Sequence, residues 1–492
     1  MSLSNEIPAD PSDRLENPDH TGAAPEGDGG SGGGGGAFVS FKSPGYPPLF
    51  MAGLFAFISV QMQFLLRGIL AWDLTERESA LGVTYLAFGL AMLVATPLGG
   101  VASDRLSKRS VLLFSQGVIM VMAVSMGAAV VTGVVQFWML VVAAVAQGVA
   151  FGFFGPARVA ISSELVGRDH LGNAITLSLL SLNGTRVFAP SLAGVLAGIA
   201  TVGIGGAYLI AGAASIAGLL FLFRVPDTSK AGAVETTGST PSVAPDTGTA
   251  DASDTVTADS ADTRRTNPIE ELVEGVRYVV DRRPLRRVVL TSFFVVMFGF
   301  NYIAFYPALV KGVFERGDAS VGFISTVSAI GAVLISLPLA AKANSPWARM
   351  AMVAAGLGFG LGVAAVGLSP SFLVACAVVF FVGAATTTFQ SLSNTLALNM
   401  ADESHQGRVQ SLMQLSFAGF GLAALPIGVL AEVIGLQPTI VIMGSIAAGA
   451  AAVYAVLEGG WAGLRPTTPD ADGDLATVGP DDHLARPAAA RP

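Results

Sequence analysis

Long apolar runs of about bilayer length constrain this chain more than any other feature. A helix needs roughly 20 apolar residues to cross the hydrocarbon core of a membrane, and such runs recur along the sequence, separated by short polar segments. We therefore expect an all-α membrane protein with about twelve transmembrane helices. The predicted spans begin near Pro48, Ala80, Ser110, Gln136, Gly172, Gly205, Val288, Ser320, Ala348, Ser371, Val409 and Gln437.

Charged residues are scarce and unevenly placed. They make up 13% of the chain, against about 25% in soluble domains, and the acids gather in residues 1–30, 227–281 and after position 458. The net charge of −8 belongs to these polar segments, so it gives no indication of a nucleic-acid partner. The four histidines show no metal-ligand spacing, and no ATP-binding loop or nucleophile–base motif occurs. We expect neither a metal, a cofactor nor an enzyme activity.

Composition divides the chain into six parts. Residues 47–225 and 286–458 are predicted to form two six-helix bundles, with disordered cytoplasmic segments at residues 1–46, 226–266 and 459–492. Residues 267–285 are predicted to form an amphipathic helix at the membrane interface, because apolar residues recur there at helical spacing and a basic cluster follows at Arg282–Arg287. A soluble linker helix is the alternative.

Basic residues predict the orientation, because cytoplasmic loops carry an excess of Lys and Arg. With both termini in the cytoplasm, the inner side of the membrane holds fourteen such residues and the outer side three, which are Arg77, Lys311 and Arg316. We therefore expect a multi-pass protein of the cytoplasmic (inner) membrane with both termini inside.

The two halves of the sequence resemble each other. Pro190 and Gly194 correspond to Pro426 and Gly428, and each of these glycines begins a Gly-Val-Leu-Ala segment. Internal repeats of this kind are typical of secondary transporters, whose substrate site lies between the halves near mid-membrane.

The segment Gly100–Arg109 reads Gly-Val-Ala-Ser-Asp-Arg-Leu-Ser-Lys-Arg. It closely resembles the signature loop G-x-x-x-D-R-x-G-R-[RK] of the major facilitator superfamily, with Ser107 in place of the second Gly. Further stretches resemble the enterobactin-exporter-like and macrolide-efflux-like branch, among them Pro156-Ala-Arg158 and Gly407-Arg408-Val409. The resemblance extends from about Pro48 to about Glu458 and implies the major facilitator fold, with two pseudo-symmetric bundles of six helices.

The resemblance also implies a function. It implies a proton-coupled secondary transporter that exports small organic molecules, either drug-like or siderophore-like, by alternating access. An importer of the same fold, a uniporter and a non-transporting membrane receptor or scaffold are the alternatives. The expected partners are a small-molecule substrate, the lipid bilayer and a coupling proton, and we expect a monomer. The nearest acids, Asp73 and Glu432, lie at the outer ends of their spans, so the sequence does not identify the proton carrier.

Asp104 is predicted to act in gating, because the resemblance implies that it latches the halves together while the outer side is open. A carboxylate at the end of a span can pair with a cation or with the N-terminus of a neighbouring helix. The alternative is a charge cluster that only sets topology. The residues predicted to gate with it are Arg105, Arg109, Arg158 and Arg408.

Arg67 and Arg186 are the basic residues placed within apolar spans, where a charge is costly and must face protein or water. They predict an anion-attracting cavity for a carboxylate, catecholate or phosphate group. In the alternative interpretation Arg186 bonds carbonyls and polar neighbours, whereas Arg67 extends to the membrane surface. Other polar side chains within the spans could line the same cavity or join helices by hydrogen bonds: Gln61, Gln63, Asn183, Asn301, Tyr302, Gln390 and Asn394.

Overall fold

The computed structural model describes residues 39–227, 268–340, 346–402, 405–460 and 464. Within these residues the regular structure is helical and no strand occurs. Some side chains inside the helices also lie outside the description, including those of Asp104, Asn183 and Gln414.

Six long helices form the first half of the molecule, which we call the N half, after a short 3₁₀ turn at Val39–Lys42. Each begins close to the position predicted from the sequence, since short polar segments end one apolar run and begin the next. The helices are α1 (Tyr46–Thr75), α2 (Glu78–Arg105), α3 (Lys108–Val131), α4 (Phe137–Val166), α5 (Arg168–Gly198) and α6 (Gly203–Leu222).

The second half, the C half, follows a separate helix, α8 (Pro268–Asp281). Its first membrane segment is irregular: α9 (Arg283–Phe294) continues through η3 (Val295–Gly299) and η4 (Phe300–Ile303), and η5 (Ala308–Val313) comes after a turn. Five helices complete it: α10 (Asp318–Ala340), α11 (Ala348–Gly367), α12 (Phe372–Asn399), α13 (Gln406–Ile434) and α14 (Leu436–Leu457).

Ten helical segments of the described chain are long and apolar enough to cross a membrane. They confirm ten of the predicted spans by length and composition. The other two correspond to α5, of 31 residues, and α13, of 29 residues, which are also long enough. In α13 the apolar stretch recognised in the described residues is Gly419–Ile434.

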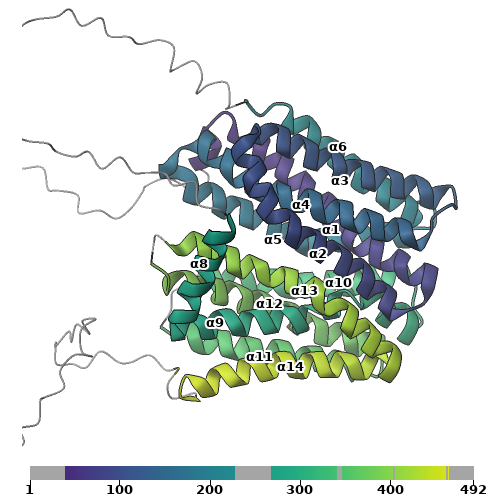
Figure 1. Ribbon diagram of the computed structural model, residues 1–492. Helices are drawn as coiled ribbons and strands as arrows, with labels where there is room; N and C mark the ends of the chain where they lie inside the picture. The colour runs from purple at the N-terminus through teal and green to yellow at the C-terminus, as the bar shows by residue number, and fades with distance from the viewer. Residues whose placement is uncertain (1–38, 228–267, 341–345, 403–404, 461–463, 465–492) are drawn as a thin grey trace, which may run out of the picture.

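The two halves lie side by side, with α1–α6 in one layer and α9–α14 in the other (Figure 1). Between them α2 packs along α13, and α5 packs along α10. A large buried cluster of apolar side chains includes Leu66 and Tyr85 of the N half and Phe305 and Phe389 of the C half. The hydrophobic core therefore continues from one half into the other.

Glycine lets the halves approach closely at two related places. A Cβ added to Gly194 of α5 would lie 2.2 Å from the Cα of Gly322 in α10, and one added to Gly428 of α13 would lie 2.6 Å from the carbonyl oxygen of Glu78 in α2. Gly194 and Gly428 are the glycines that correspond in the internal repeat. Small residues allow this backbone-to-backbone packing between membrane helices, so the repeat predicted from sequence supplies both contacts.

The irregular first segment of the C half was not expected from its apolar sequence. Asn301 donates a hydrogen bond from Nδ2 to the carbonyl oxygen of Met297, 2.6 Å away, an acceptor that the backbone N–H of residue 301 would use in an α-helix. Pro307 has no backbone N–H to donate to the carbonyl oxygen of Ile303, one turn earlier. Side-chain capture of a carbonyl and a proline are both recognised causes of a break in a helix.

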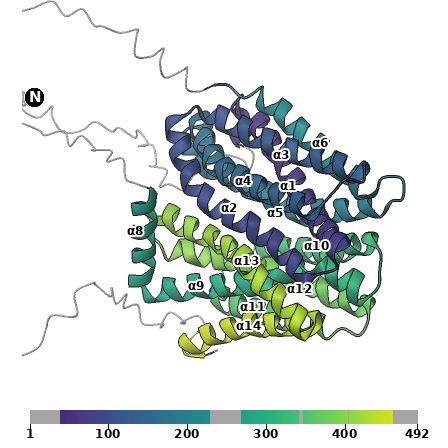
Figure 2. The same ribbon diagram turned by 45° about the vertical axis from the view of Figure 1, so that its right-hand side comes forward.

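Helix α8 lies across the end of the C half, beside α13 and α9 (Figure 2). Its predicted range was 267–285, and the observed helix ends at Asp281, before the basic cluster that begins at Arg282. Asn267, where the predicted range begins, lies outside the described residues.

We predict that Gly322→Val destabilises the contact between the halves. The new side chain would meet the backbone of Gly194 and Val195 at about the 2.6 Å that a Cβ alone reaches, so α5 and α10 would have to separate. Overpacking of this kind costs about 1–3 kcal/mol. The thermal unfolding midpoint of the purified protein should fall. Gly117→Val is the matched control, because a Cβ at Gly117 meets open space; equal midpoints for both variants would contradict the prediction.

Candidate functional site at the contact between the halves

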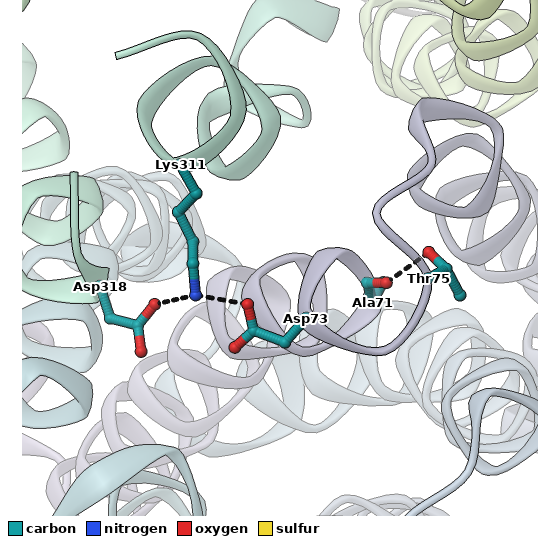
Figure 3. Close-up of polar contacts among 5 residues, drawn as sticks. All are labelled: Ala71, Asp73, Thr75, Lys311 and Asp318. Carbon is teal, nitrogen blue, oxygen red and sulfur yellow. Dashed lines mark hydrogen bonds and ion pairs between the residues drawn. The ribbon is translucent and has the colours of Figure 1, made fainter. Parts of the chain in front are cut away.

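An ion-pair bridge joins the halves at one end of the molecule. Lys311 of η5 binds Asp73, in the last turn of α1, and Asp318, the first residue of α10 (Figure 3). Two carboxylates thus share one ammonium group. Nearby, Ser79 of α2 donates its hydroxyl hydrogen to Glu432 of α13 at 2.6 Å, which forms a second polar link between the halves.

The local structure explains how Asp73 reaches Lys311. The α1 helix ends at Thr75, whose hydroxyl donates to the carbonyl oxygen of Ala71 at 2.7 Å (Figure 3), and Glu76 stops the helix with a left-handed φ of 50°. A Cβ on Gly312 would lie 2.6 Å from the Trp72 ring. Because glycine stands beside Lys311, the Trp72 ring of the N half packs directly against η5.

At the opposite end, the ion pairs of the described residues stay outside the contact between the halves. Lys108 of α3 binds Glu164 of α4 at 2.6 Å within the N half, and Arg287 binds Glu458 at 2.8 Å within the C half. Neither pair links α2 to α13 or α5 to α10, whereas the Lys311 bridge does connect the two halves.

Helix α8 is fastened to the C half at this opposite end. Arg282, just after α8, binds Asp402 through two hydrogen bonds of 3.1 and 2.6 Å. These bonds from the guanidinium, together with one from Tyr278, hold the pKa of Asp402 below its usual range. Arg408 of α13 binds Glu274 of α8 at 2.9 Å. Helix α8 is therefore joined to the C half by two ion pairs.

Arg67 lies deep inside the N half, with 2% of its surface exposed. Its Nη1 donates to Oε1 of Gln147 in α4 at 2.8 Å. The guanidinium carbon lies 5.7 Å from the centre of the Phe64 ring and 5.6 Å from that of Phe88. The alternative in which Arg67 extends to the membrane surface is therefore wrong.

An aromatic group connects this arginine to the other half. The Phe64 ring lies 4.6 Å from the ring of Tyr85 and 6.0 Å from that of Phe420, which belongs to α13. Asn301 donates from Nδ2 to the carbonyl oxygen of Phe420 at 3.1 Å. Two predicted site residues, Arg67 and Asn301, are thus brought to the two sides of one aromatic contact.

The predicted gating residues are spread over several contacts. Arg158 is buried, with its guanidinium carbon 4.8 Å above the Phe57 ring and close against Gly53 of α1. Arg109 donates to the carbonyl oxygen of Phe223 at 2.8 Å, and Arg105 is exposed at the end of α2. The Asp104 side chain lies outside the described residues, so its predicted role in gating stays a prediction.

The other predicted cavity residues lie in different surroundings. Gln63 binds Ser59 at 3.1 Å and the carbonyl oxygen of Ile119 at 3.4 Å, and the Tyr302 ring meets those of Tyr306 and Phe359 edge-on within the C half. These contacts agree with the alternative of hydrogen bonding and packing between helices. Four other predicted residues are partly buried: Gln61 on α1, Arg186 on α5, and Gln390 and Asn394 on α12. The Asn183 side chain lies outside the description.

Several residues at the contact were missed by the sequence interpretation. Lys311 was assigned only to the outer side of the membrane, and the sequence interpretation did not single out Gln147, Phe64, Tyr85 or Phe420. One signal was available for Gln147, since an amide inside an apolar run needs a partner. The aromatic residues carry no such signal, because rings are common in every membrane helix.

Two layers of membrane-spanning helices, joined through pseudo-symmetric glycine contacts, define a membrane transporter of the two-bundle class. The chain matches the family model of the Major Facilitator Superfamily over residues 49–414, and again over residues 288–477, and belongs to that family. It is therefore a multi-pass membrane transporter for a small molecule, and not an enzyme.

Curated relatives agree with the branch expected from sequence. The enterobactin exporter EntS of Shigella flexneri is 23% identical over 376 residues, covering 75% of this chain and 80% of the exporter. EntS of Escherichia coli O1:K1 / APEC is 22% identical over the same length.

Solved structures confirm the fold. A bacterial homologue of the human lysosomal transporter Spinster, in an inward-facing and unoccupied conformation, has a TM-score of 0.64 and 15% identity. The match covers 87% of this chain and 99% of that one. The nucleoside transporter NupG has a TM-score of 0.60 and 14% identity, with coverage of 84% and 98%.

We predict that Lys311→Met weakens closure at the Lys311 end. Removing the shared cation leaves Asp73 and Asp318 without their partner, and a half-exposed pair contributes about 1 kcal/mol, or roughly fivefold in the ratio of open to closed molecules. Nitroxide labels are attached at Arg77→Cys and Gly317→Cys in a Cys376→Ala background. Electron paramagnetic resonance should then show a longer distance between the two labels in Lys311→Met than in the protein that keeps Lys311.

Arg316→Met is the control for this experiment, because Arg316 lies beside Lys311 but contacts the Phe372 ring at 5.9 Å and belongs to no ion pair of the described residues. It should leave the distance distribution unchanged. If Lys311→Met behaved like the control, the bridge would have no part in closure.

Proposed function

We propose that this chain exports small organic molecules across the cytoplasmic membrane by alternating access. The observation that carries the proposal is the unequal contact between the halves. At the Lys311 end, ion pairs, a hydrogen bond and glycine contacts join them, whereas the described ion pairs at the other end do not cross the contact. Alternating access requires two halves that can close at one end while they separate at the other.

The orientation is part of the proposal. The Lys311 end carries Arg77, Lys311 and Arg316, and the opposite end carries most of the remaining basic residues of the short loops. The positive-inside rule then puts the Lys311 end outside and both termini in the cytoplasm. In this orientation the conformation is closed to the outside, and its similarity to an inward-facing transporter supports the same assignment.

Outward direction is supported by the enterobactin exporters among the relatives, and we propose a drug-like or siderophore-like solute. We propose a monomer coupled to protons. Asp73 is our candidate proton carrier, because it is a carboxylate whose partner, Lys311, belongs to the other half, so that its protonation would weaken the closed end. An importer of the same fold would also close at the Lys311 end during its cycle, so this contact does not determine the direction of transport. A receptor would not need the two halves to separate at this end.

The test measures small molecules inside and outside cells by mass spectrometry, at equal membrane abundance of each variant. Cells with the original chain should accumulate one compound class outside, in excess of cells that lack it. Inward accumulation would establish an importer, and unchanged distributions in both directions would favour the receptor.

We predict that Asp104→Asn lowers this export at least about tenfold, a loss of roughly 1.4 kcal/mol in the rate-limiting step, without lowering membrane insertion. Positive-inside topology does not require an acid at this position, so the effect would come from the conformational cycle. Asp281→Asn, a change of the same type at an exposed acid at the end of α8, should transport normally. Equal transport by both variants would contradict the prediction that Asp104 holds the two halves together.

A further inference from the structure

Arg67 and Gln147 present more hydrogen-bond donors than their surroundings accept. Arg67 Nε and Nη2 and Gln147 Nε2 are buried without a hydrogen-bond partner among the described residues. Both side chains are nearly inaccessible, with 2% and 1% of their surfaces exposed. Buried polar groups are normally paired, and a buried cation without a counter-charge is especially costly. These three donor atoms therefore indicate a missing acceptor.

The protein does not supply the balancing charge in its described part. The phenols of Tyr85 and Tyr208 lie near Arg67, and phenols are neutral at physiological pH, so they do not balance its charge. The nearest acid along α1, Asp73, is already bound to Lys311. The ring faces of Phe64 and Phe88 lie against the guanidinium and partly stabilise its positive charge. A ring face is not a conventional hydrogen-bond acceptor, so these contacts do not pair the N–H groups of Arg67.

We infer that Arg67 and Gln147 form a binding site for a single anionic group, such as a carboxylate or phenolate. An arginine presents donors in a planar fork that matches an oxyanion, and the amide of Gln147 adds a neutral donor next to it. The inference rests on the proposed transport function, whose substrate would then carry a negative charge. A free inorganic anion has the same chemistry and is the other source.

The site is positioned to respond to movement of the halves. Its flanking ring, Phe64, contacts Phe420 of the C half, and Tyr85 also meets Phe420 at 5.8 Å. A Cβ on Gly421 would lie 2.8 Å from the carbonyl oxygen of Tyr85, so α13 covers this region closely. As α13 moves away from α2, the aromatic cover is removed. Binding and release of the anionic group would then follow the conformational cycle.

The experiment uses the purified full chain in discs of zwitterionic phosphatidylcholine, which contribute no anionic lipid. The thermal unfolding midpoint is measured in a low-salt zwitterionic buffer that contains neutral sorbitol, and again after addition of sodium chloride, sodium benzoate or neutral benzamide. A ligand that binds only the folded state raises the midpoint. Benzoate but not benzamide should raise it by a few degrees if the anion belongs to an organic solute, and chloride should do so if it is inorganic.

Two variants test the residues. Arg67→Gln should abolish the response to anions. Gln147→Glu supplies an internal carboxylate to Arg67, so it should raise the midpoint in the low-salt buffer and abolish the response to added anions at the same time. Gln116→Glu, at another buried glutamine, is the control and should lower the midpoint, because the described partner of the Gln116 amide is Ser215 and not a cation.

The proposal is overturned if neither benzoate nor chloride shifts the midpoint of the original chain, or if Gln147→Glu keeps the full response. A merely structural Arg67 would not produce a rise in stability together with a loss of anion binding. Failure of the proposed function is distinguishable, because a chain that exports nothing from cells could still bind the anion in discs.

Discussion

The contact between backbones at Gly194 and Gly322, and its counterpart at Gly428 and Glu78, is the interaction on which the arrangement of the two halves depends. In a bilayer the hydrophobic effect does not press helices together, because lipid is as apolar as the helices. Association relies instead on close packing and a few polar links. Glycine makes the packing close at these two places, where backbone meets backbone and no large side chain interlocks.

The Lys311 bridge adds a different kind of interaction at the same end. Packing alone is insensitive to the chemical state of the solution, whereas a cation shared by Asp73 and Asp318 depends on protonation of those carboxylates. A transporter that must open and close at one end needs contacts that are specific but not too strong. The combination of glycine packing with one exposed ionic bridge satisfies both requirements.

Much of the fold could be predicted from the sequence. Apolar runs and polar breaks located the helices, because a membrane allows few alternatives to a continuous helix of bilayer length. The internal repeat identified Gly194 and Gly428, which proved to lie at equivalent contacts. The break in the first segment of the C half could not be found in this way, since it depends on Asn301 bonding to carbonyls of Met297 and Phe420, one of which belongs to a distant helix.

The candidate site was only partly predictable, for a related reason. Arg67 could be identified as an isolated charge in an apolar run, but its environment depends on which helix lies beside it. The sequence left open whether it reached the membrane surface, and packing against α4 and Gln147 decided the matter. Lys311 likewise looked like one of several outer cations, because nothing in the spacing of Asp73 and Lys311 shows that the ends of α1 and η5 meet.

The irregular segment gives these separate features a common mechanical basis. Asn301 holds Phe420 of α13 through its carbonyl oxygen, Phe420 contacts Phe64 beside Arg67, and η5 of the same segment carries Lys311. In a regular α-helix the backbone N–H of residue 301 would bind the carbonyl oxygen of Met297. Here the Asn301 side chain binds that oxygen instead. Because the helix is broken, one segment of the C half contacts both the Lys311 bridge and the aromatic rings that cover Arg67, so displacement of that segment would change both together.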